Sequence, residues 1–265
     1  MSRSNPIETS ANPCARWFQW DAAEDGGVVS WWDKDRQERV KCEKFAFLLL
    51  DELATVKGWH DPSESGIYAN EVRDLRSDVL VVKSFKGGEL AVGTYASIKD
   101  RVAVLGGKFS QSCYIAFKDE EGQYRLGNIQ FTGAGIGPWI EFKKEAGQKR
   151  DLNGKLRPAV YVDAVSIKGF TEGQKGRVRF RSPKFSLVAV SAEANEIADS
   201  LDAELQEFLK AYLARGKSDQ AQSTAQHHHA DDTPQRPKDE AWQAMADKPK
   251  QTGSGFDDMD DDIPF

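Results

Sequence analysis

The alternation of apolar and polar residues around short turns is the feature that most constrains the fold. Residues 112–118 alternate between a side that holds Ile115 and Phe117 and a side that ends with Lys118. Residues 119–122, Asp-Glu-Glu-Gly, predict a tight turn, and residues 123–131 return as a partner strand. Because the side chains of a strand alternate between two faces, this pattern predicts an antiparallel hairpin with one buried face.

A second hairpin is predicted from residues 15–21 and 27–33, joined by a turn over residues 24–27. The two segments carry a dense set of large aromatic residues, which are Trp17, Phe18, Trp20, Trp31 and Trp32. Core packing accounts for such a set. The alternative is that one or two of the rings lie on a surface where bases stack. The Trp31–Trp32 pair fits either interpretation.

The remaining β pattern is spread along the chain. Residues 78–85, 159–170 and 177–191 predict strands, and residues 45–53 predict either a strand or a short helix. Glycine-rich residues 133–137 predict a flexible segment that leads to Trp139. Many short strands with frequent turns favour a mainly β domain, for which an OB-fold-like small barrel with a C-terminal helix is the expected architecture.

That helix is predicted over residues 191–215. Apolar residues recur at intervals of three and four from Ala194 to Leu213. Ser191 suits the N-cap, and Gly216 is the predicted stop. We expect the helix to cover one face of the sheet.

The charge of the chain is unevenly distributed. Residues 217–265 hold five basic and eleven acidic residues, which accounts for the whole net charge of −6. The segment 141–184, by contrast, holds twelve basic residues and five acidic ones. The composition predicts a disordered N-terminus at residues 1–13, a domain at residues 14–216, a disordered linker at residues 217–256 and an acidic tip at residues 257–265.

The tip ends on two apolar residues beside a run of carboxylates. Its last six residues are Asp260, Asp261, Asp262, Ile263, Pro264 and Phe265. A run of like charges at the end of a chain most often serves as a solubilising tail. The apolar end favours a peptide ligand instead, held by a partner with a small apolar pocket and a basic rim.

These six residues, preceded by Asp257-Asp258-Met259, resemble the C-terminal tip of bacterial single-stranded DNA-binding proteins. The resemblance covers nine of 265 residues. The bacterial family begins with an apolar strand and has a shorter DNA-binding domain, which this chain does not share. The chain is more similar to bacteriophage-encoded single-stranded DNA-binding proteins, which pair divergent domains with acidic tails. The resemblance implies non-sequence-specific binding of single-stranded DNA, and recruitment of replication, recombination and repair proteins through the tip.

Candidate DNA-binding residues are bases and aromatic residues that interleave on predicted strand faces. Three arginines alternate with Val178 and Phe180, so their guanidinium groups share one face of a strand. The full candidate set is Lys83, Phe85, Lys86, Tyr114, Lys118, Arg125, Trp139, Arg177, Arg179 and Arg181.

No catalytic constellation emerges from the sequence, and we expect neither an enzyme nor a cofactor or metal site. Gly107-Lys108 lacks the other residues of a phosphate-binding loop, because Val102 and Phe109 stand where that motif needs Gly and Ser or Thr. Cys14, Cys42 and Cys113 have no metal-binding spacing, and their odd number predicts reduced thiols in a cytoplasmic protein.

Three functions remain open at this stage. The first is single-stranded DNA binding with recruitment through the tip. The second is an interaction adaptor that uses the tip to capture or compete for host repair factors without binding DNA. The third is a nuclease or recombination enzyme with the same tip, for which Glu141 and Lys143 give only a partial motif.

Overall fold

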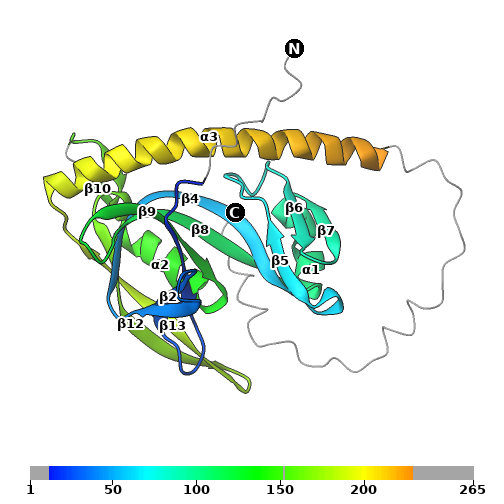
Figure 1. Ribbon diagram of the computed structural model, residues 1–265, viewed down its shortest axis with the longest axis horizontal. Helices are drawn as coiled ribbons and strands as arrows, with labels where there is room; N and C mark the ends of the chain where they lie inside the picture. Colours follow the sequence, from blue (N-terminus) through cyan, green and yellow to red (C-terminus); the bar gives the residue numbers. More distant parts are fainter. Residues whose placement is uncertain (1–11, 152, 229–265) are drawn as a thin grey trace, which may run out of the picture.

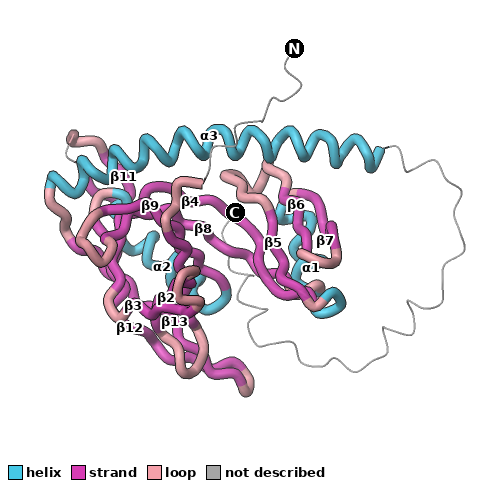
Figure 2. The backbone as a smooth tube through the Cα atoms, in the orientation of Figure 1, coloured by secondary structure: helices cyan, strands magenta, loops and turns pink. Residues whose placement is uncertain are grey.

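The computed structural model describes residues 12–151 and 153–228 of the chain (Figure 1). The predicted N-terminal disorder up to residue 11, the tip at residues 257–265 and the linker beyond residue 228 lie outside the described residues. Within them, strands dominate, and three α-helices pack around one large mixed sheet (Figure 2). The prediction of a mainly β domain with a C-terminal helix is confirmed.

The main path of the sheet runs in the order β3-β2-β1-β9-β8-β4-β5-β6-β7. In that order the strands are β3 (Glu38–Cys42), β2 (Val28–Asp33), β1 (Arg16–Asp21), β9 (Tyr124–Thr132), β8 (Gly107–Lys118), β4 (Phe45–His60), β5 (Ser65–Ala69), β6 (Leu80–Ser84) and β7 (Gly88–Gly93). Both predicted hairpins are present, as β1–β2 and β8–β9. The two ends of the path, β3 and β7, do not pair, so the described strands do not close into a barrel.

The long strand β4 divides the sheet into two arms. One edge of β4 pairs with β8 from Phe47 to Gly58. The other edge pairs at its start with β12 (Ala164–Lys175) and at its end with β5. β12 continues into a hairpin with β13 (Val178–Val188). A β-bulge between Leu49 and Asp51 interrupts the pairing with β8 near the division. The alternative of a short helix at residues 45–53 is therefore excluded.

The inner face of the sheet carries the hydrophobic core. We call inner the side that holds Val56, Ile115 and Ile129, which are all fully buried. It packs against α1 (Tyr95–Val104) and α2 (Ile136–Ala146). A short 3-10 turn at Gly133–Gly135 leads directly into α2, so this glycine-rich segment is helical rather than flexible. A second 3-10 turn, Ala159–Tyr161, precedes β12, and residues 61–63 form a third. A separate ribbon joins β10 (Gln148–Arg150) to β11 (Leu156–Pro158).

The outer face is covered only in part. The helix α3 (Ala192–His228) runs along the length of the molecule (Figure 1). Its Leu205, Phe208 and Leu209 pack on Leu53 and Tyr114 of the outer face. The predicted N-cap is present, because the backbone N–H of Ala194 donates to the Ser191 hydroxyl oxygen at 3.2 Å.

The predicted helix end at Gly216 is wrong. α3 continues through Gly216 to His228. A glycine inside a helix costs only about 1 kcal/mol relative to alanine, and residues 217–228 contain no proline to break the hydrogen-bond ladder. The predicted linker therefore begins with three turns of helix.

Candidate nucleic-acid interface

The aromatic residues of β1 and β2 divide cleanly between the two faces. Phe18 and Trp20 point inward and are buried in the core. Trp17 and Trp32, at outer positions of the two strands, are 47% and 49% exposed. Trp31 is half-buried on the inner side, where the Arg16 guanidinium lies 4.0 Å above its ring. The Trp31–Trp32 pair is thus split by strand alternation.

A second group of exposed rings lies on β4, β5 and the end of β6. Trp59, Tyr68 and Phe85 are 56%, 39% and 73% exposed. Tyr68 and Phe85 are stacked, with ring centroids 4.6 Å apart. Gly66 makes room for this pair, because a Cβ atom at that position would lie 3.3 Å from the Phe85 ring. The stacked pair presents a broad aromatic surface to solvent.

All the exposed aromatic side chains within the described residues lie on the outer face. They are Trp17, Trp32, Trp59, Tyr68 and Phe85. The strand registers support this placement. Tyr68 pairs with Lys57. Trp17 pairs with Asn128, and Asn128 pairs with Tyr114 on its other side, so these residues lie on the same side of the sheet. We call the part of the outer face that α3 leaves open the aromatic face. Exposure of so many large rings on one side marks an interaction surface.

Basic residues share the aromatic face with the rings. Outer strand positions hold Arg39, Lys41, Lys57, Lys83 and Lys108. The acidic strand residues on this side are Asp21 and Glu89, near the ends of β1 and β7, and Asp51, which is ion-paired with Arg73. Desolvation by neighbouring side chains lowers the pKa of Lys57, an effect that the nearby Glu71 carboxylate partly offsets. The strands of this face therefore carry more basic than acidic side chains, and Glu71, which follows β5, adds one more carboxylate.

The middle of the aromatic face is hollowed. Small polar side chains of β8 and β9 pair across the two strands here, with Asn128 Nδ2 donating to Ser112 Oγ at 2.8 Å and Thr132 Oγ1 donating to Ser110 Oγ at 2.7 Å. A pocket of about 190 Å³ has Asn128, Tyr114 and the α3 residue Tyr212 in its lining. It is lined by Trp17 of β1 and also by Tyr68 of β5, four strands away in the sheet order. The pocket therefore extends over the strands from β1 to β5.

Among the candidates from the sequence, Lys83 and Phe85 lie on the aromatic face as the alternation predicted. Both are exposed, and Lys86 is exposed in the turn that follows β6. Lys118 and Arg125 are exposed near the β8–β9 turn, away from the rings. Lys118 lies 5.0 Å from the Tyr124 ring centroid, and Arg125 is ion-paired with Asp119 at 3.1 Å.

Two aromatic candidates from the sequence are buried. Tyr114 occupies an outer position but lies under α3, and its hydroxyl donates to the Glu71 carboxylate. Trp139 belongs to α2 and is fully buried in the core, where its Nε1 donates to Glu52 at 2.8 Å. Trp139 is closed to a base, whereas Tyr114, although only 2% exposed, borders the pocket on the outer face.

Two arginines of the β12–β13 hairpin make contacts within the protein. Arg179 forms an ion pair with Glu24 at 3.0 Å. Arg181 donates to the Gly26 carbonyl at 2.7 Å and lies 4.3 Å from the Phe170 ring centroid. These contacts hold the hairpin against the β1–β2 turn. Of the three candidate arginines, only Arg177, in the turn before β13, is exposed without a described ion pair. The adjoining open cleft is lined by Glu24 and Glu172 as well as by both arginines, so its charges offset one another.

The candidate set from the sequence misses Trp17, Lys57, Trp59 and Tyr68. A usable signal exists for two of them. Thr55, Lys57 and Trp59 alternate with apolar Ala54 and Val56, which places a base and an indole on the solvent side of one strand. The continuous apolar run at residues 45–50 obscures this alternation.

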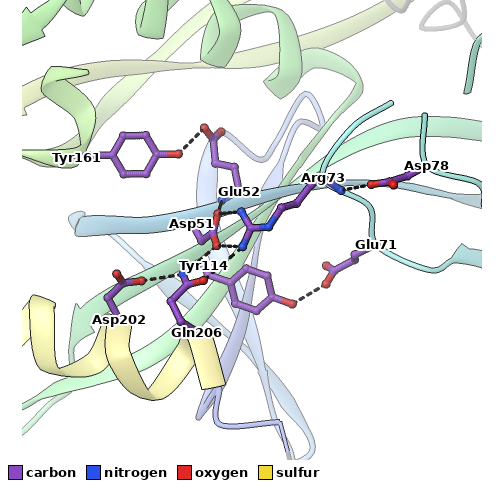
Figure 3. A network of polar contacts seen from close by, with 9 residues as sticks. All are labelled: Asp51, Glu52, Glu71, Arg73, Asp78, Tyr114, Tyr161, Asp202 and Gln206. Atoms are coloured by element: carbon purple, nitrogen blue, oxygen red, sulfur yellow. Dashed lines mark hydrogen bonds and ion pairs between the residues drawn. The ribbon is translucent and has the colours of Figure 1, made fainter. Parts of the chain in front are cut away.

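A polar network lies on both sides of β4 at its bulge (Figure 3). Arg73 binds Asp51 through two nitrogens at 2.9 and 2.6 Å, and Gln206 of α3 donates to the same carboxylate at 3.0 Å. Glu52, which points to the other side, accepts from Lys143 at 2.8 Å and from the Tyr161 hydroxyl at 3.1 Å. Because each carboxylate accepts several hydrogen bonds, the network joins β4 to α2 and α3.

Three largely buried groups with ionisable hydrogens, the thiol of Cys14 and the hydroxyls of Tyr114 and Tyr161, predict that the protein loses stability at alkaline pH. Burial, with a contribution from Glu71, raises the pKa of Cys14 from 9.0 to about 12. Burial also raises the pKa of Tyr114 and of Tyr161 above the ordinary value of 10.0. At a pH between the ordinary and the raised pKa of each group, the unfolded chain binds fewer protons than the folded chain. The free energy of unfolding therefore falls as the pH rises.

We therefore expect the free energy of unfolding in urea to be retained up to about pH 9 and to decline from there to about pH 11. Tyr114→Phe removes one of the titrating groups and should make the decline shallower. An unchanged free energy across this range contradicts the expectation.

Within the described residues no group of three or more His, Cys, Asp or Glu side chains is arranged to hold a metal ion. None of the described helices combines the length and apolarity needed to cross a membrane. No family model, curated protein or solved structure matches the chain.

Proposed function

We propose that this protein binds single-stranded DNA across the aromatic face without sequence specificity. The observation that carries the proposal is that every exposed aromatic side chain of the described residues lies on one basic face of the sheet. Single-strand binders combine cationic grooves with aromatic platforms, since every base has a π-face that stacks on a ring.

The expected mode of binding follows from the layout. The rings lie on β1 and β2 at one side and on β4, β5 and β6 at the other, so a strand that contacts both crosses the sheet. Lys57 and Lys83 lie between or beside the rings and neutralise phosphates, with release of counterions. Duplex DNA hides the faces of its bases, so it cannot use the aromatic platform. OB folds likewise bind single strands across one face of a sheet.

The acidic tip supplies the second part of the proposal. Its resemblance to the bacterial tip supports recruitment of replication, recombination and repair proteins by Ile263, Pro264 and Phe265 with the preceding aspartates. The alternative, an adaptor that does not bind DNA, shares this tip. The aromatic face favours the binding function, because an adaptor that acts only through its tip needs no exposed rings on the sheet.

The test is a titration of the full chain with oligo-dT, followed by tryptophan fluorescence at a low and a high salt concentration. We expect saturable quenching, because Trp17, Trp32 and Trp59 are exposed on the binding face. Salt should weaken binding, since phosphate neutralisation releases counterions. Duplex DNA of the same length is the control. Absence of binding by both fluorescence and gel shift would refute the proposal and leave the adaptor function.

A further inference from the structure

Lys57 carries an amine without a partner at the pocket on the aromatic face. It lines the pocket of about 190 Å³ together with Tyr68 and Glu71. The residue is exposed, and its side chain has no hydrogen-bond or ion-pair partner among the residues that the structure describes. By contrast, the Lys143 ammonium is held by the Glu52 carboxylate at 2.8 Å. The Lys57 amine is therefore available to a ligand that lies on the face.

The surroundings of this amine favour its neutral, nucleophilic form. Desolvation by neighbouring side chains lowers the pKa of Lys57, and the Glu71 carboxylate offsets part of this effect. A second lysine lies on the same face, because Lys108 of β8 is directly opposite Lys57. Desolvation and a neighbouring cation are the two conditions that activate the lysines with which enzymes form Schiff bases.

The pocket also contains an acid–base group. Glu71 borders the same pocket, and its carboxylate accepts a hydrogen bond from the Tyr114 hydroxyl. Formation of a Schiff base needs a group that carries protons from the amine to the departing oxygen. A carboxylate has further lone pairs besides the one that Tyr114 occupies. Glu71 can therefore carry these protons, while Tyr114 fixes its orientation.

The bound strand determines which carbonyl compound reaches Lys57. An intact nucleotide has no aldehyde, whereas a nucleotide that has lost its base presents one at C1′ of its sugar. Lys57 and Lys108 attract phosphates to this part of the face, so the sugars of the strand pass beside the amine. A sugar without a base cannot stack on Tyr68, and the small pocket suits a sugar better than a larger organic ligand.

Resting on the proposed function, we propose that Lys57 captures abasic sites in single-stranded DNA as a Schiff base. The amine nitrogen attacks C1′ of the aldehyde, and a carbon–nitrogen bond forms. Both hydrogens of the neutral amine leave with the aldehyde oxygen as water, carried by Glu71, and a carbon–nitrogen double bond results. The step needs no oxidant or reductant. Water hydrolyses the adduct, so the capture is reversible.

The experiment incubates the full chain with a labelled single strand that contains one abasic site. Borohydride then reduces the Schiff base to a stable amine, and a denaturing gel measures the trapped fraction. Lys57→Arg keeps the positive charge but cannot form the adduct, so its trapped fraction should fall to the background seen with an intact strand. Lys155→Arg, in the exposed turn before β11, is the control that should trap as the wild type does.

Two further readouts separate the possible outcomes. Each variant is used at a protein concentration that saturates its binding to the strand, so a change in affinity does not alter the trapped fraction. Mass spectrometry of the trapped wild-type complex should place the adduct on Lys57. Equal trapping by the wild type and Lys57→Arg would overturn the inference, as would an absence of trapping by a chain that binds oligo-dT. Failure to bind either strand would instead refute the proposed function.

Discussion

Replacing Trp59 and Tyr68 together by alanine is expected to weaken oligo-dT binding by about 30-fold or more. Stacking on one aromatic side chain contributes roughly 1–3 kcal/mol per base, and the two rings belong to adjacent strands of the same face. Tyr68→Ala also removes the ring on which Phe85 stacks, so the Phe85 platform loses its support. The measurement is equilibrium binding to a labelled oligonucleotide at fixed salt, because affinity depends on ionic strength.

The double variant should fold normally, because both side chains are more than one-third exposed. Its urea midpoint is therefore expected to stay close to that of the wild type, which a parallel unfolding curve would check. Leu156→Ala is the matched control, since it truncates a side chain of similar exposure on a different part of the surface. A loss of less than about three-fold would show that the bases do not stack on β4 and β5.

Replacing Glu52 by alanine is expected to destabilise the protein by about 3–5 kcal/mol, without a change at the DNA-binding surface. The carboxylate lies on the inner side of β4 and accepts from Trp139, Lys143 and Tyr161. Its removal leaves the Lys143 ammonium, only 25% exposed, without its ion-pair partner, and leaves two aromatic donors unsatisfied. Urea unfolding, monitored by circular dichroism, measures the loss.

Glu141→Ala provides the control for this prediction. Glu141 lies on α2, two residues from Lys143, and is exposed, so its removal should change stability by less than about 0.5 kcal/mol. Glu52→Gln should fall between the two, because an amide oxygen still accepts from Trp139 but carries no charge for Lys143. Equal stability of the Glu52→Ala and Glu141→Ala variants would contradict this prediction. It would show that the hydrogen bonds of Glu52 do not stabilise the packing of α2 on β4.

The local sequence pattern was sufficient to predict several secondary-structure elements of this protein. Alternation and a turn at residues 119–122 predicted the β8–β9 hairpin, and the spacing of apolar residues after Ser191 predicted α3 and its N-cap. These elements depend on interactions between residues close in the chain, which is why sequence alone defines them. The separation of a neutral domain from an acidic tail is likewise a property of composition.

Only the tertiary structure decided which rings are accessible. Tyr114 and Tyr68 both occupy outer strand positions, but α3 covers the first and leaves the second open. Arg179 and Arg181 alternate as predicted, yet they contact Glu24 and Gly26, about 155 positions earlier in the chain. Alternation determines the side of a strand on which a residue lies. Whether that side faces solvent depends on segments that are distant in sequence, and these contacts leave no local pattern.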